Sequence, residues 1–98
     1  MTLEELTAVV TKSAANAPSI GKTIKLELDL GVVFIDLSSD DAVVSNEDKE
    51  ADATITTTLE TLQKLTTGDI NPMMAVMTGK IKIKGDMGAA MKLQSLLS

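Results

Sequence analysis

The spacing of the apolar residues changes repeatedly along this chain, and these changes constrain the fold more than any other feature. The stretch GKIKIKGDMGAAMKLQ, residues 79–94, shows one change. Its first half places isoleucine at every second position, which is typical of a strand with one solvent-exposed face. Its second half has apolar residues at helical spacing after Asp86, which can cap a helix. Glycines separate the two halves, so a strand is expected to lead into a helix here.

The N-terminal half predicts one helix followed by three strands. Thr2 and Glu5 have the spacing of a capping box. The apolar stripe predicted for this helix consists of Leu3, Leu6, Val9 and Val10. Strands are expected at 24–30, 32–37 and 42–46, where apolar residues alternate or β-branched residues gather.

The C-terminal half predicts a strand at 53–58, a helix ending at Gly68, a short helix starting at Asn71, a strand at 80–84 and a final helix. The buried stripe predicted for the final helix consists of Met87, Ala90, Met91 and Leu97. The full order is helix, three strands, crossover, strand, two short helices, strand and helix. It predicts an α+β fold, in which a five-stranded, mostly antiparallel sheet is covered on one face by helices. Its 98 residues suit a single two-layer domain spanning 1–98.

Composition excludes several kinds of site. The chain has no histidine and no cysteine, so His-based triads, thiol nucleophiles, zinc sites and disulfides are not expected. Its net charge is −5, it lacks arginine and it has one aromatic residue, which argues against nucleic-acid binding. The adjacent acids Asp40 and Asp41 fit a solvated turn better than acid–base catalysis. We therefore expect no cofactor, no metal and no enzymatic activity.

Two features have both a structural and a functional interpretation. Lys80, Lys82 and Lys84 form a basic strip that fits either a solvated edge strand or contact with an anionic membrane surface. Apart from Met1, all methionines lie between residues 73 and 91. Methionine at helical spacing fills cores, and it also lines adaptable binding surfaces.

Three motifs in the C-terminal half resemble the sterol carrier protein type 2 domain family. The first is ADATI at 51–55, and the second is Gly68 with Asn71-Pro72 and then Gly79-Lys80. The third is KGDMG at 84–88, leading into AMKLQ. Together they cover about half of the chain, in the order and spacing of that family.

The resemblance implies a non-enzymatic intracellular lipid carrier that holds a sterol, fatty acid, fatty acyl-CoA or phospholipid in an apolar tunnel between sheet and helices. Met91 and Gln94 fall where the family lines its tunnel, with Gln94 as a polar contact. The apolar lining residues expected beside them are Met87, Met74, Met77, Leu62, Val33 and Ile35. Val33 stands where the family often has tryptophan, and the family's N-terminal helical region is often longer.

A second interpretation is an accessory or self-association module of a larger lipid-metabolising assembly, without its own cargo. Val32 and Phe34 point away from the predicted core face, so they could form a weak homodimer patch. The chain shows no signal peptide, no apolar run of the roughly 20 residues that a membrane span needs, and no C-terminal Ser-Lys-Leu. A soluble, cytoplasmic protein is therefore expected.

Overall fold

The computed structural model describes residues 2–17 and 19–97, with side chains described for all of these except residues 66, 72 and 94–97. The strands are β1 (Lys22–Leu28), β2 (Gly31–Leu37), β3 (Val43–Ser45), β4 (Ala53–Thr56) and β5 (Lys82–Gly85). The helices are α1 (Leu3–Ala15), α2 (Leu59–Thr67), α3 (Pro72–Met77) and α4 (Met87–Leu97). The predicted order of elements is confirmed.

The five strands form one sheet in the order β3-β2-β1-β4-β5. The pairs β1–β2, β2–β3 and β4–β5 are antiparallel, and β1–β4 is parallel. The predicted α+β fold with a mostly antiparallel sheet is therefore confirmed. The first strand begins and ends two residues earlier than expected, because Leu30 lies in the turn before β2 and is exposed.

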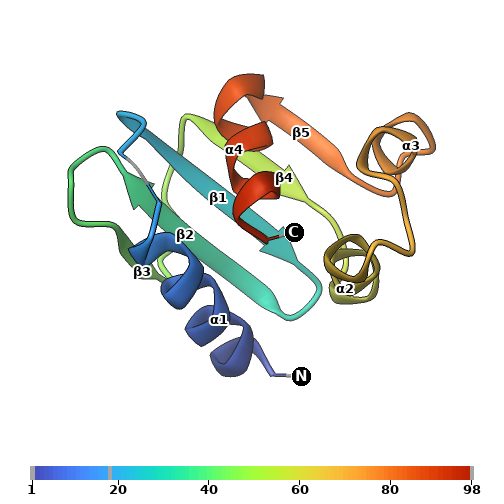
Figure 1. Cartoon of the computed structure of the whole chain (residues 1–98), viewed down its shortest axis with the longest axis horizontal. Helices are drawn as coiled ribbons and strands as arrows, with labels where there is room; N and C mark the ends of the chain where they lie inside the picture. Colours follow the sequence, from blue (N-terminus) through green and yellow to red (C-terminus); the bar gives the residue numbers. More distant parts are fainter. Residues whose placement is uncertain (1, 18, 98) are drawn as a thin grey trace.

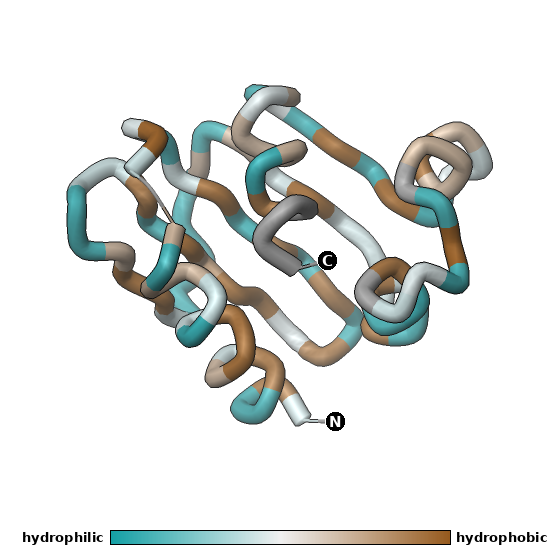
Figure 2. Tube along the Cα trace, in the orientation of Figure 1, coloured by the Kyte–Doolittle hydropathy of each residue, from teal (hydrophilic) through white to brown (hydrophobic). Residues whose placement is uncertain are grey.

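Helices α1 and α4 lie across one face of the sheet, α1 over β2 and β3 and α4 over β1, β4 and β5 (Figure 1). On β1 and β5 apolar residues alternate with polar ones, as the brown and teal segments of Figure 2 show, whereas β2 is apolar over most of its length. Ile24 pairs with Ile35 and Leu26 with Val33, and none of these four side chains is more than 1% exposed. The centre of the core therefore lies on β1 and β2.

Local capping signals fix most helix ends. The Thr2 hydroxyl accepts a hydrogen bond from the Glu5 amide at 3.2 Å, and the Glu5 carboxylate accepts one from the Thr2 amide at 3.0 Å. The Thr58 hydroxyl accepts from the Thr61 amide at 3.2 Å at the start of α2. Gly68 ends α2 with φ 81°, a left-handed conformation that favours glycine. The caps at Thr2 and Gly68 confirm the boundaries predicted from sequence, whereas the strand expected at 53–58 ends earlier, at Thr56.

The buried face of α1 differs in part from the predicted stripe. Leu6, Val10 and Ala14 are buried against the sheet, whereas Val9 is 48% exposed. The prediction for Val9 is wrong, because residues at i, i+4 and i+8 suffice to cover β2 and β3 and Val9 falls beside that row.

The connection from β3 to β4, residues 46–52, crosses the sheet face that the helices leave open. Lys25 and Phe34 are cross-strand partners on this face. The Lys25 ammonium lies 3.0 Å from the Asp48 carboxylate, and the Lys49 ammonium lies 5.5 Å from the Phe34 ring centroid. Phe34 is consequently only 7% exposed. The prediction of an exposed apolar patch is wrong for Phe34, because the connection covers the phenyl ring, whereas Val32 is partly exposed.

Candidate functional site

The floor of the candidate site is the helix-covered face of the sheet. Val33 and Ile35 on β2 are completely buried there, beneath α1 and beside β1. Leu62 on α2 is 6% exposed and belongs to the same core. The structure therefore brings these three predicted lipid-binding residues together in one apolar interior.

Helix α4 packs on this floor through small side chains. Ala89, Ala90 and Leu93 are at most 3% exposed, and α4 contacts three strands and α1. Met87 and Met91 lie on its outer side, 52% and 46% exposed. The predicted buried stripe is therefore wrong for both methionines, because the alanine side chains let the helix approach the sheet closely on the neighbouring face. The side chains of Gln94 and Leu97 lie outside the described residues.

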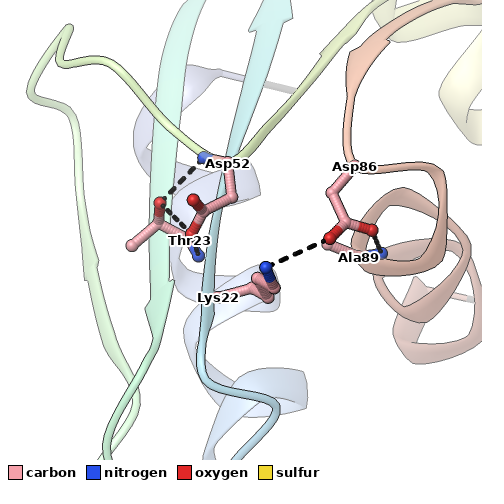
Figure 3. Close-up of polar contacts among 5 residues, drawn as sticks. All are labelled: Lys22, Thr23, Asp52, Asp86 and Ala89. Carbon is pink, nitrogen blue, oxygen red and sulfur yellow. Dashed lines mark hydrogen bonds and ion pairs between the residues drawn. The ribbon is translucent and has the colours of Figure 1, made fainter.

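The first turn of α4 is tied to the sheet by Asp86 (Figure 3). One carboxylate oxygen accepts a hydrogen bond from the Ala89 amide at 3.1 Å, and the other lies 3.4 Å from the Lys22 ammonium on β1. The Ala89 hydrogen bond and, after it, the contact with Lys22 lower the pKa of the Asp86 carboxyl. The predicted cap is confirmed, and it also joins α4 to β1.

A second carboxylate completes the anchor. Asp52 accepts hydrogen bonds from the Thr23 amide at 2.8 Å and from the Thr23 hydroxyl at 3.2 Å, and its backbone carbonyl accepts from the Asp86 amide at 2.8 Å. Gly85 adopts φ 86°, and a Cβ there would lie 2.2 Å from the Asp52 carbonyl oxygen. Only glycine therefore fits where β5 leads into α4.

Helices α2 and α3 lie beyond the end of the sheet rather than across its face (Figure 1). Met74 and Met77 on α3 are 56% and 77% exposed. The core nevertheless continues toward this end through partly buried apolar side chains, which include Leu59, Leu65, Ile70 and Ile83. Sequence reasoning did not single these four out as site residues, although Leu59, Leu65 and Ile83 have the apolar spacing of their helix or strand.

The predicted lining residues thus fall into three sets. One is the buried floor, and the others are the exposed methionine pairs on α3 and α4, which lie at opposite ends of β5 (Figure 1). Among the described side chains, the buried polar ones are Thr57 and Thr61, and both are hydrogen-bonded. An apolar interior without a buried charge in the described part suits a hydrocarbon ligand.

No helix within residues 2–17 and 19–97 is both long and apolar enough to cross a bilayer.

The architecture is that of a sterol carrier domain. The solution structure of sterol carrier protein domain 2 of Helicoverpa armigera matches with a TM-score of 0.75 at 25% identity, covering 95% of this chain and 83% of that one. The profile of the SCP-2 sterol transfer family matches residues 3–98. The chain belongs to this family.

Two relatives show in what setting similar sequences occur. Sterol carrier protein 2 of Bos taurus is 53% identical over 55 residues, which make up 56% of this chain and 10% of that protein. Hydroxysteroid dehydrogenase-like protein 2 of Danio rerio is 37% identical over 70 residues, 69% of this chain and 17% of that protein. The matched segments therefore span only about a tenth to a sixth of the length of these two relatives.

Proposed function

We propose that residues 1–98 form a non-enzymatic lipid-binding and lipid-transfer domain whose cargo is a sterol, fatty acid, fatty acyl-CoA or phospholipid. The observation that carries the proposal is the apolar interior between the sheet and α4, which continues to the surface at the α2–α3 end. Membership of the SCP-2 sterol transfer family supports the same activity. The names of the relatives add sterols as a ligand class.

In this proposal the hydrocarbon part of the ligand lies on the floor formed by Val33, Ile35 and Leu62. Met87 and Met91 on α4 and the α3 methionines Met74 and Met77 turn inward around it, and Gln94 contacts its polar group. Methionine suits this role, because its unbranched, polarisable side chain repacks easily around different shapes.

The energetics favour a site that closes when it is empty. A ligand pocket of about 300 Å³ would cost about 7 kcal/mol as an empty cavity, at about 24 cal/mol per Å³. That is comparable to the whole stability of about 5–15 kcal/mol of a small domain. The structure fits such a closed state, because the alanines of α4 are buried against the sheet while its methionines are exposed. Ligand binding then requires α4, or the α2–α3 end, to move outward.

Lipid binding should raise the melting temperature by several degrees at saturating fatty acid, because the ligand stabilises only the folded state. The decisive experiment is organic extraction of freshly purified protein, followed by mass spectrometry of the lipids and by displacement of a fluorescent fatty acid. Recovery of no lipid, together with no displacement and an unchanged melting curve, would refute the proposal.

A matched pair of variants tests the place of the site. Met91→Glu on α4 and Val9→Glu on α1 introduce the same charge at helical positions that are 46% and 48% exposed. If Met91 turns onto the ligand, Met91→Glu weakens fatty-acid binding and Val9→Glu does not. Equal effects of the two variants would remove Met91 from the site.

A second function is an accessory or self-association module of a longer protein. It is favoured by the observation that the matches cover 10% and 17% of the relatives named above. Size-exclusion mass that rises with protein concentration would support a weak homodimer, and bound lipid in native mass spectrometry would support the carrier. We also propose that transfer involves brief contact of Lys80, Lys82 and Lys84 with an anionic membrane.

A further inference from the structure

Helix α3 carries four exposed apolar side chains, which include the two most exposed large apolar side chains of the described residues. Met73, Met74 and Met77 are 65%, 56% and 77% exposed, and Val76 is 39% exposed. Among the described side chains of this helix, only that of Ala75 is buried. Figure 1 places α3 at one tip of the molecule's longest axis, and Figure 2 colours most of it on the hydrophobic side of the scale. A protruding apolar helix is unusual for a surface that faces only water.

Three lysines follow this helix directly. The Lys80 amide donates to the Ala75 carbonyl of α3 at 2.9 Å, so the lysine strip begins at the helix itself. Lys82 and Lys84 continue along β5 and are exposed. At about 3.3 Å per strand residue, Lys84 lies only about 13 Å further along the strand. Lys80 therefore adjoins the apolar helix, and Lys82 and Lys84 extend the basic strip from it along the edge strand.

These lysines differ from four of the six other lysines of the chain. Lys22, Lys25, Lys49 and Lys64 each form an ion pair with a carboxylate. Within the described part of the chain, no ion pair involves Lys80, Lys82 or Lys84. Their β4 neighbours on the open face, Thr54 and Thr56, are uncharged. The positive charge of β5 is thus available to an external partner.

Two acids adjoin the ends of this surface, and one of them, Asp86, already has an ion pair. Asp69, just before α3, accepts a hydrogen bond from the Thr67 hydroxyl at 3.0 Å. Asp86, just after β5, lies 3.4 Å from Lys22. Most other acids gather at residues 36–52, which hold seven acids and one lysine. Three of these acids lie on β2 or just before β3, and the other four lie in the connection that leads from β3 across the open face to β4.

We propose that α3 and β5 form a membrane-docking surface, in which the α3 methionines insert into the headgroup–acyl boundary of an anionic bilayer while Lys80, Lys82 and Lys84 contact its phosphates. The lysines of β5 attract this edge of the sheet, with α3 beside it, toward the negative surface. Insertion of an apolar helix face combined with basic residues is the general mode of interfacial binding. The inference deepens the proposed lipid transfer by naming the surface that meets the membrane.

A second copy of this chain fits the surface less well. A two-fold dimer through α3 would place the same patch of both subunits face to face. Six unpaired lysines would then approach one another, which like-charge repulsion opposes. A bilayer that carries negative headgroups satisfies both the apolar helix and the lysines.

Vesicle flotation tests the charge requirement, with vesicles of phosphatidylcholine alone and of phosphatidylcholine containing about one part in three of phosphatidylserine. The intact chain should bind the anionic vesicles and not the neutral ones. Lys80→Glu/Lys82→Glu should lower this affinity by at least about 25-fold, because each lysine near the surface contributes about fivefold. The matched control, Lys12→Glu/Lys92→Glu, changes two other exposed lysines and the net charge equally, and it should bind nearly as well as the intact chain.

A tryptophan reporter tests insertion, because the chain has no tryptophan or tyrosine of its own. The fluorescence of Met73→Trp should shift to shorter wavelength with anionic vesicles. Val43→Trp, on the exposed and opposite edge strand β3, should not shift. No shift for Met73→Trp, equal shifts for the two reporters, or equal losses in the two lysine variants would overturn the proposal.

Fatty-acid displacement in the absence of vesicles separates the two proposals. If displacement occurs but no vesicle binding does, the docking surface is refuted and lipid binding stands. If vesicle binding occurs without displacement, the docking surface stands and the carrier function fails. Protein mass that grows with concentration in the absence of vesicles and falls in Lys80→Glu/Lys82→Glu would identify a second copy as the occupant instead.

Discussion

Two regions of this molecule differ in how far their apolar side chains are buried. The packed half, formed by α1, β1 and β2, buries Ile24, Val33 and Ile35 completely. The methionine end, formed by α2, α3 and the start of β5, has its most exposed apolar side chain at Met77. A helix of six residues is too short to be stable by itself, and α3 has little tertiary packing to support it. The contrast indicates that stability resides in the first region and that adaptability resides in the second.

Hydrogen exchange should show the largest difference between the two regions. Amides of β1 and β2 should exchange only by global unfolding, whereas those of α3 should exchange by local opening, about 1,000-fold faster. The measurement is native-state exchange followed residue by residue by NMR. Similar protection in both regions would remove the contrast.

Truncation of a core side chain should follow in size. Leu26→Ala removes a side chain that is 1% exposed and should lower the free energy of unfolding by about 3 kcal/mol. Met77→Ala, at 77% exposure, should change it by less than about 0.5 kcal/mol. Chemical denaturation of both variants measures the difference, and equal losses would contradict the division into two regions.

The junction between β5 and α4 is tested at Gly85. Gly85→Ala should cost about 2–3 kcal/mol, because the new Cβ meets the Asp52 carbonyl in addition to the strain of a positive φ. Gly21→Ala and Gly68→Ala are matched controls, since both glycines have positive φ but nothing within 4 Å of the added Cβ. Each control should cost only about 1 kcal/mol. A Gly85 variant no worse than the controls would show that the junction tolerates movement.

The smallest effect concerns the charge of Asp86. Its pKa is lowered in the folded state, so its stabilising contribution is present above the ordinary pKa of 3.8 and is lost as the pH falls through the lowered folded value. Asp86→Ala should lower the melting temperature by about 5 °C at neutral pH. The difference from the intact chain should shrink toward zero below the folded pKa.

Lys22→Ala separates the two contacts of Asp86. It removes the exposed ion pair but keeps the helix cap, so the melting temperature should fall by less than about 2 °C. Thermal unfolding from neutral to acidic pH measures both variants. A pH-independent effect of Asp86→Ala would show that its charge is irrelevant.

Sequence reasoning succeeded where the signal was local. The capping box at Thr2, the stop at Gly68 and the start at Asn71 each depend on a few neighbouring residues, and all three occur as predicted. It failed for Met87 and Met91, because the first turns of α4 are apolar or small on nearly every side. Periodicity alone could not decide which side of that helix meets the sheet. The lining roles of these methionines and of Gln94 stay predictions.

Phe34 shows the same limit at longer range. Strand alternation placed Phe34 on the face opposite the core. Its burial, however, depends on residues 46–52, which cross that face and contact Lys25 and Phe34.

The sequence by itself determined the order of elements, their caps and the apolar floor of the sheet, because these depend on local periodicity and hydrogen bonding. Only the tertiary structure decided the strand order β3-β2-β1-β4-β5, the face of α4 that is buried and the exposure of α3. Those features depend on contacts between residues far apart in the chain, which no local pattern encodes.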